Sequence, residues 1–327
     1  MQSSDFEVTS PPNDGISDLS FSSQADFLAV SAWDNMVRIY EVQPSGSTVP
    51  KASYNHEGPV FCIDWSKDGN CVASGGADNT VKKYDLATGQ STTIGNHSNP
   101  IKSAKFLDNQ NILATASWDK TVKYWDMRSP QPVGTLQLPE RCYTMDTKGN
   151  LLVVGTADRH VCVVNLSNPT TIYKQVISPL KWQTRVVSCF IDGKGYAIGS
   201  IEGRLGIQYV DDSEAAKCFS FKCHRDETKN VYAVNDISFH PGYGTFSTAG
   251  ADGTVSFWDK DSKKRLTTLP KANNTIACTA FNRTGNIFAY AISYDWTQGH
   301  QAHATQGNIN RLMLHAVKDE EVRSQGR

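Results

Sequence analysis

Short runs of alternating hydrophobic and polar residues recur along the whole chain, and turn residues separate them. One run covers residues 60–66, a turn follows at residues 68–70, and a second apolar run covers residues 71–76. Alternation with a period of two is typical of a β-strand that buries one face, and a tight turn between two such runs is typical of a hairpin. No segment of useful length shows helical periodicity. The pattern therefore predicts an all-β protein.

One string of residues recurs along the chain in seven copies. The clearest copies are GGADNTVKKYD (residues 75–85), ASWDKTVKYWD (116–126) and AGADGTVSFWD (249–259). Each copy carries one acidic residue that marks it, namely Asp34, Asp78, Asp119, Asp158, Glu202, Asp252 and Asp295. The intervals between these markers are 44, 41, 39, 44, 50 and 43 residues, close to the length of a four-stranded blade, about 40 to 45 residues. We therefore expect a seven-bladed β-propeller.

Two of the repeats carry matching sets of polar side chains. The sets are His56, Ser74, Asp78 and Tyr84, and His97, Thr115, Asp119 and Trp125. They resemble the blade network of WD-repeat proteins, in which the Asp accepts backbone amides and orients the His, and the His bridges to the hydroxyl and the indole. A His–Asp pair can also act in catalysis, but recurrence once per blade favours a structural role. Two other repeats have Val154 and Ile198 at the hydroxyl position, so we expect their blades to depend on apolar packing.

The last repeat shows only three expected strands, near residues 276–281, 285–292 and 311–317. Residues 6–9 can supply the fourth strand, which would close the ring and cover strand edges that otherwise invite aggregation. We therefore expect a single propeller over residues 1–317, closed by the N-terminal strand. The charged tail, residues 318–327, is expected to be disordered.

Composition and charge exclude several classes of protein. The 327 residues are 39% hydrophobic, which allows a large core, and 32 Lys and Arg balance 33 Asp and Glu. No global field therefore draws the molecule onto nucleic acid or anionic lipid. The N-terminus lacks the pattern of a secretion signal, and no apolar run of about 18 residues occurs, so we expect an intracellular protein without membrane insertion. The eight cysteines lack metal-ligand spacing, so we expect them to be mostly buried and reduced, with no metal or cofactor.

Side chains that meet a partner are expected at the loops on one face of the ring, where the second strand of each blade turns into the third and where each blade joins the next. Three of these turns carry a tryptophan beside the acidic marker, Trp33, Trp118 and Trp296. Exposed aromatic residues are frequent in interface hot spots. The alternative is that these tryptophans cap neighbouring blades.

The segments between successive blades add basic and aromatic residues to the same face. They are Arg141, Tyr143, Lys181, Arg185 and Arg225. An Arg can give a carboxylate two charge-assisted hydrogen bonds, so such a rim suits an acidic peptide. For each single charge, a solvated side chain remains the alternative. On the opposite face the basic run 263–265 is a phosphate candidate, although a solvated turn is favoured because no aromatic residues interleave with it.

Nearly the whole chain resembles two sister families of WD-repeat proteins, the nuclear-pore messenger-RNA export factors and the mitotic-checkpoint propellers that bind checkpoint kinases. Both families share the strings SPLKWQTR (residues 178–185), SIEGR (200–204) and FKCHR (221–225). The export branch is favoured by SWDK (117–120), FWDKD (257–261) and SYDW followed by GH (293–300).

The resemblance to export factors implies a partner and a location. The partner is a GLEBS motif, a short segment of an FG-repeat nucleoporin that offers glutamates to basic side chains on the propeller top. Arg225 matches the family's main basic position, and His224 precedes it. Trp33, Trp118, Tyr143 and Arg185 would line the same path, with Lys181 and Arg141 near it. The resemblance further implies links to RNA or RNA–protein export particles and a location in the nucleus, at the nuclear pore and partly in the cytoplasm.

No catalytic constellation stands outside the repeat. The chain has no Gly-rich phosphate loop, no GxSxG elbow and no His/Cys set with metal-ligand spacing, so we expect neither an enzyme nor a small-molecule substrate. We expect a monomeric scaffold. Two alternatives stay open: a spindle-checkpoint adaptor that binds GLEBS motifs of kinases, and an unrelated WD-repeat adaptor such as a ubiquitin-ligase substrate receptor.

Overall fold

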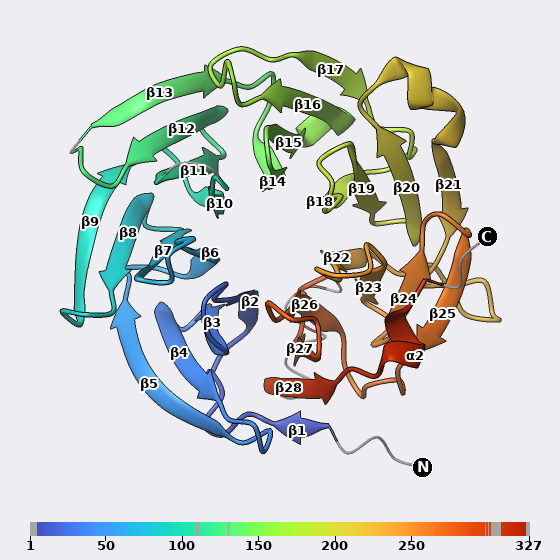
Figure 1. Cartoon of the computed structure of the whole chain (residues 1–327), viewed down its shortest axis with the longest axis horizontal. Helices are drawn as coiled ribbons and strands as arrows, with labels where there is room; N and C mark the ends of the chain where they lie inside the picture. Colours follow the sequence, from blue (N-terminus) through green and yellow to red (C-terminus); the bar gives the residue numbers. More distant parts are fainter. Residues whose placement is uncertain are drawn as a thin grey trace.

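The computed structural model of the protein describes residues 5–108, 111–129, 131–297, 299, 301 and 309–324. Within these residues the chain forms seven antiparallel four-stranded sheets that stand around a common centre, like blades (Figure 1). This arrangement confirms the all-β, seven-bladed β-propeller that the repeats predict.

In blades 1 to 3 the four strands of each sheet follow one another in the sequence, from the innermost strand at the centre of the ring to the outermost strand. Blade 1 contains β2 (Ile16–Phe21), β3 (Phe27–Ala32), β4 (Met36–Val42) and β5 (Thr48–Asn55). Blade 2 contains β6 (Val60–Trp65), β7 (Cys71–Gly76), β8 (Thr80–Asp85) and β9 (Gln90–Asn96). Blade 3 contains β10 (Ile101–Phe106), β11 (Ile112–Ser117), β12 (Thr121–Asp126) and β13 (Pro132–Gln137).

Blades 4 to 6 repeat the plan. Blade 4 contains β14 (Cys142–Lys148), β15 (Leu151–Thr156), β16 (His160–Asn165) and β17 (Lys174–Ile177). Blade 5 contains β18 (Thr184–Cys189), β19 (Gly195–Ser200), β20 (Arg204–Tyr209) and β21 (Phe219–Lys222). Blade 6 contains β22 (Val234–Phe239), β23 (Phe246–Gly250), β24 (Val255–Asp259) and β25 (Lys264–Thr268). The loops add the 3-10 helices η1 (Ala157–Arg159) and η2 (Asp212–Lys217).

The hydrophobic core lies between neighbouring blades. One cluster joins Val37 and Ile39 of blade 1 to Val60, Ile63 and Val72 of blade 2, and similar clusters fill the other gaps. Each sheet is covered on both faces, so its second strand is mostly apolar and buried, as in β7, where every residue is buried. In the two blades without a hydroxyl, Val154 and Ile198 are fully buried in apolar clusters, as expected.

The N-terminal strand closes the ring. Blade 7 contains β26 (Ile276–Phe281), β27 (Ile287–Ile292), β28 (Arg311–Ala316) and, on its outside, β1 (Phe6–Glu7). β1 pairs antiparallel with β28, and the Val8 amide donates a further hydrogen bond to the Leu312 carbonyl at 2.8 Å. This confirms the predicted closure, with β1 ending at Glu7 and not at Thr9, because the Thr9 amide turns to the Thr48 hydroxyl of blade 1.

The expectation of a disordered tail is wrong for residues 318–324. Residues 319–322 form the short helix α2 (Asp319–Val322), which packs on β24 and β25 of blade 6. Val322 is buried within the cluster between blades 6 and 7, and its carbonyl accepts a 2.6 Å hydrogen bond from the Thr245 hydroxyl. Tertiary packing of one apolar side chain therefore outweighs the charged composition of the segment. Across the described residues, no helix is long and apolar enough to cross a membrane.

Candidate partner-binding surface

Hydrogen-bonded networks hold the turns that carry the predicted surface residues. In blade 3, Nδ1 of His97 lies 2.8 Å from Asp119 Oδ2, and Nε2 lies 2.8 Å from the Thr115 hydroxyl, which also accepts the Trp125 indole N–H at 2.8 Å. This is the predicted arrangement. Burial lowers the pKa of His97. Burial opposes ionisation of Asp119, but hydrogen bonds from Thr121 and His97 outweigh it and lower the pKa of that carboxyl. The network fixes the turn that bears Trp118.

The network of blade 2 differs from the prediction in its aromatic member. His56 contacts Asp78 at 2.8 Å and the Ser74 hydroxyl at 2.7 Å, as expected. The second partner of Ser74, however, is the hydroxyl of Tyr54, at 2.8 Å, from β5 of blade 1. Tyr84 stacks on the Tyr54 ring at a centroid distance of 5.0 Å. A phenol carries its polar atom at the far end of the ring, so Tyr84 cannot replace an indole N–H.

A third network lies in blade 6, and it corrects the prediction for His224. Its Nδ1 is 2.9 Å from Asp252 Oδ1, and its Nε2 is 2.9 Å from the Thr248 hydroxyl, which also accepts the Trp258 indole N–H at 2.9 Å. His224 is buried and uses both ring nitrogens, so it supports the surface from beneath and is not one of its exposed side chains. Sequence reasoning missed this network because the longer segment after His224 separates it from Thr248 by 24 residues, compared with 18 in blades 2 and 3.

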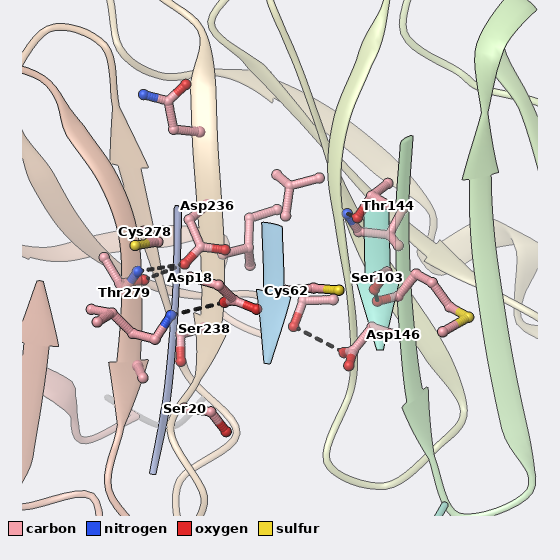
Figure 2. Close-up of a pocket in the computed structure, with 18 of the residues that line it drawn as sticks. Asp18, Ser20, Cys62, Ser103, Thr144, Asp146, Asp236, Ser238, Cys278 and Thr279 are labelled. Carbon is pink, nitrogen blue, oxygen red and sulfur yellow. Dashed lines mark hydrogen bonds between the residues drawn. The ribbon is translucent and has the colours of Figure 1, made fainter. Parts of the chain in front are cut away.

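Carboxylates lock neighbouring blades together along the central channel. The Asp18 carboxylate accepts the Ile63 amide at 3.0 Å, Asp146 accepts the Cys189 amide at 2.7 Å, and Asp236 accepts the Thr279 amide at 2.6 Å. Figure 2 shows the three carboxylate side chains projecting into the channel from different inner strands. Each hydrogen bond links the inner strand of one blade to that of the next, so the ring that carries the upper loops is rigid.

The channel stabilises the charge of its buried lysine but not that of its buried carboxylate Asp236. Burial opposes the charged form of Lys105, but the carboxylates of Asp64, Asp18, Asp146 and Asp236 outweigh it and raise the pKa of this lysine. Burial raises the pKa of Asp236 to about 7. The channel below its upper mouth therefore holds a charged lysine among carboxyl groups whose ionisation burial opposes.

Four of the predicted partner-binding residues meet at the upper mouth of the channel. Trp33, Trp118, Tyr143 and Arg185 line one cavity of about 380 Å³, together with Trp296. Trp33 contacts both Trp296, at a ring-centroid distance of 6.3 Å, and Phe61, at 5.3 Å. The alternative that the tryptophans only cap blades does not describe Trp33, because 40% of its surface is exposed.

A second group of predicted residues lies on the rim of the same face. Arg225 is exposed, and its guanidinium donates a 3.0 Å hydrogen bond to the Glu202 carbonyl. The Lys181 amide donates to the carboxylate of the same Glu202 at 3.3 Å. Glu202 therefore brings Arg225 and Lys181 together.

Comparison with known proteins agrees with this architecture. A family model described as WD domain, G-beta repeat matches residues 6–41, 48–85, 89–126 and 216–259. The chain is 54% identical over 325 residues to the Poly(A)+ RNA export protein of Schizosaccharomyces pombe, covering 98% of this chain and 92% of that protein. It belongs to the WD-repeat mRNA export factor family. Two other members are the mRNA export factor GLE2 of Chaetomium thermophilum, 54% identical, and Protein RAE1 of Arabidopsis thaliana, 52% identical, with 92% and 93% of their lengths covered and 98% of this chain in both cases.

Two exposed apolar residues of this family member were not among the surface residues predicted from the sequence. Trp182 is 60% exposed and Ile201 is 38% exposed. The Ile201 amide donates to the Gln183 carbonyl, next to Trp182, so both side chains belong to the rim around Arg225. The string SPLKWQTR contained a signal for Trp182, because it places a tryptophan in the segment between two blades, just before the strand that begins at Thr184.

Other candidates lie apart from these two groups. Arg141 is exposed and pairs only with its neighbour Glu140, at 3.7 Å, among the described residues. On the basic run of the opposite side, Lys263 lies over the Phe219 ring at 4.7 Å and Arg265 over the Trp258 ring at 6.0 Å. The structure thus supplies the neighbouring aromatic rings that the sequence did not show, because Phe219 comes from β21 of the preceding blade.

Proposed function

We propose that this chain is a non-catalytic scaffold at the nuclear pore that binds the GLEBS motif of an FG-repeat nucleoporin and supports mRNA export. The names of its relatives, Poly(A)+ RNA export protein and mRNA export factor, support the export role. The proposal places the protein in the nucleus and at the nuclear envelope, with a cytoplasmic fraction.

The surface around Arg225 carries the proposal. Among the described residues, Arg225 forms no ion pair, and its one hydrogen bond goes to a carbonyl, so most of the five guanidinium N–H groups can serve a carboxylate. Trp182, Ile201 and Val231 flank it with exposed apolar surface, since Val231 forms a β-bridge with Arg225 itself. A cation set among exposed apolar residues is the chemistry of an interface hot spot for an acidic peptide.

The loop that follows Arg225 is preorganised. The Asp226 carboxylate accepts hydrogen bonds from the Thr228 hydroxyl at 2.7 Å, the Asn230 amide at 2.9 Å and the Tyr232 hydroxyl at 2.9 Å. These bonds hold residues 225–232 in one conformation before a partner arrives. Binding then loses less conformational entropy, which favours affinity.

Replacement of Arg225 by Glu tests the proposal. We expect the affinity for a synthetic GLEBS peptide to fall by about 100-fold, because a charge-assisted pair worth a few kcal/mol is replaced by repulsion. Isothermal titration calorimetry measures the change. The melting temperature should barely move, since Arg225 is exposed.

Arg283→Glu is the matched control. Arg283 is also exposed, but it lies in the turn between β26 and β27, at the opposite face of the ring, so the same charge change should leave peptide affinity unaltered. Equal affinity of the Arg225→Glu and wild-type proteins would reject the assigned site. Tighter binding of GLEBS motifs from checkpoint kinases than from nucleoporins would instead favour the checkpoint adaptor.

A further inference from the structure

The outer surface of the seam between blades 5 and 6 carries cations placed over aromatic rings. Four of the five cation–π contacts among the described residues lie there. The rings all belong to the hydrophobic cluster between these two blades. We call this surface the lower seam and define it by four contacts with distances of 5.6, 5.2, 4.7 and 6.0 Å to the ring centroid, Lys217–Tyr209, Lys260–Phe190, Lys263–Phe219 and Arg265–Trp258.

The lower seam lies away from the surface around Arg225. Strand β21 begins at Phe219 within the seam and ends at Lys222, and Arg225 follows on the upper rim. Blades 5 and 6 are neighbours in the ring (Figure 1), and their Phe221 and Trp258 rings meet at a centroid distance of 4.7 Å. The chemistry of the lower seam is therefore independent of the proposed function.

Two of the four cations of the lower seam have no carboxylate partner. Lys217 and Lys260 each contact one neighbouring carboxylate, at 2.6 and 2.9 Å. Within the part of the chain that the structure describes, the exposed side chains of Lys263 and Arg265 form neither an ion pair nor a hydrogen bond. A ring attracts a cation but does not neutralise its charge. These two side chains are therefore available to an anionic partner.

The turn that presents Lys263 is preorganised. The buried Asp259 carboxylate accepts hydrogen bonds from the Asp261 amide at 2.9 Å and from the Ser262 hydroxyl at 2.8 Å, and it also accepts one from the Ser324 hydroxyl at 2.9 Å. These bonds hold Lys263 in the left-handed region, at a φ of 58°, which is unfavourable for a residue with a side chain. A turn that is fixed before binding loses less conformational entropy when a partner docks.

The acidic helix α2 is anchored on the other side of blade 6. Val322 of α2 is buried in the cluster between blades 6 and 7, whereas Trp258, the ring beneath Arg265, packs in the cluster between blades 5 and 6. The anchor of α2 is therefore on the side of blade 6 that faces blade 7, and the lower seam is on the side that faces blade 5.

We propose that the lower seam docks an acidic segment of a partner protein. The Arg265 guanidinium donates two parallel hydrogen bonds to one carboxylate, and Lys263 binds a second carboxylate of the same segment. An apolar side chain between the two acidic residues packs on the half-buried rings of Phe219 and Phe221, which stack at a centroid distance of 6.0 Å.

The same observations argue against single-stranded nucleic acid as the partner. Proteins that bind such strands stack bases on open ring faces and neutralise many phosphates. Here cations already cover the rings, and only Lys263 and Arg265 are unpaired among the four cations of the seam. The net charge of -1 adds no long-range attraction to a polyanion. Two unpaired cations match two carboxylates of a short acidic segment.

The test uses the full chain carrying Arg225→Glu, so that the upper rim contributes little, and a fluorescein-labelled peptide of alternating Leu and Glu as the probe. Adding Lys263→Gln and Arg265→Gln should weaken binding by about tenfold, because two charge-assisted pairs are lost. The matched control adds Lys271→Gln and Arg283→Gln, which remove two exposed cations outside the seam and should leave the affinity unchanged. Fluorescence anisotropy measures the affinity, and melting curves show whether each variant folds.

A conservative substitution tests the geometry of the pair. Arg265→Lys keeps the charge but loses the planar fork, so its affinity for the probe should fall by about threefold. A probe with Gln in place of every Glu should bind neither this variant nor its parent, because the carboxylates are gone.

The outcomes separate this inference from the proposed function. A parent protein that does not bind the probe, or a folded Lys263→Gln/Arg265→Gln variant that binds it as tightly as the parent, would overturn the inference. Tighter binding of oligoadenylate than of the acidic probe, lost with the same two substitutions, would overturn it in favour of nucleic acid. With Arg225 intact, the Lys263→Gln/Arg265→Gln protein should bind a GLEBS peptide like wild type, so the proposed function is measured separately.

Discussion

At the scale of single residues, the channel shows how burial and charge oppose each other. Asp236 stabilises the ring because its carboxylate accepts hydrogen bonds from the Thr279 amide, at 2.6 Å, and hydroxyl, at 2.9 Å. These bonds link blade 6 to blade 7. The ionisation of Asp236 is costly, because burial raises its pKa to about 7. The folded state therefore holds this proton more tightly than the unfolded state, in which the pKa is near 3.8. Stability consequently falls as pH rises between about 4 and 7.

Replacement of Asp236 by Asn tests this balance. The amide oxygen can still accept from Thr279, but the buried charge is removed, so we expect a higher melting temperature than wild type at pH 8. The difference should shrink by pH 5, where wild-type Asp236 is protonated. Scanning calorimetry at both pH values measures it. A variant less stable than wild type at pH 8 would show that the charge, and not the hydrogen bond, links the blades.

At the scale of elements, one histidine joins both ends of the chain. His315 of β28 contacts Asp5, next to β1, at 2.8 Å through Nδ1, and Glu321 of α2 at 3.0 Å through Nε2. Burial opposes the charged imidazole, but the two carboxylates outweigh it and raise the pKa of His315 above 6.5. A raised histidine pKa stabilises the fold fully below pH 6.5, and this contribution is lost as pH rises through the folded-state value.

The His315→Gln variant should lose this pH-dependent contribution. We expect it to melt below wild type at pH 6 and to approach wild type at pH 9, because only a charged imidazole can donate to both carboxylates. Thermal denaturation across that range measures the effect. Parallel melting profiles of the two proteins would contradict the role of His315 in holding β1 and α2.

At the scale of the whole molecule, stability depends on closing the ring. Val8 is buried in the cluster between blades 7 and 1, and β1 supplies the outer strand of blade 7. Deletion of residues 1–8 should therefore lower the melting temperature by several degrees and promote aggregation, because β28 becomes an exposed edge. Light scattering during a thermal ramp reports both effects.

A point substitution distinguishes the contribution of strand β1 to stability from that of its ion pair. Glu7 accepts two hydrogen bonds from Arg311, at 2.9 and 2.7 Å, on an exposed surface. Glu7→Gln keeps the strand and loses the charge, so it should cost less than about 1 kcal/mol. A loss as large as that of the deletion would assign the closure to the ion pair.

Much of this protein could be predicted from local pattern. Alternating apolar positions and a repeat near 40 residues predict strands, blades and their number, since each blade is a local unit that exposes apolar faces until neighbours cover them. The His97 network was predictable because its members keep fixed offsets within one repeat. The N-terminal closure was predicted by counting strands. Seven four-stranded blades need one more strand than the last repeat supplies, and residues 6–9 can provide it.

Only the tertiary structure decided which residues share a surface. The resemblance places Trp33, Trp118, Tyr143 and Arg185 on one path, but only the structure shows that they line one cavity, because turns and inner strands of separate blades converge there. His224 moved from the expected surface into a buried network, Tyr54 replaced Tyr84 across a blade boundary, and Val322 gave structure to a charged tail. In each case a tertiary contact outweighed the local signal, because burial free energy depends on which surfaces meet and not on sequence order.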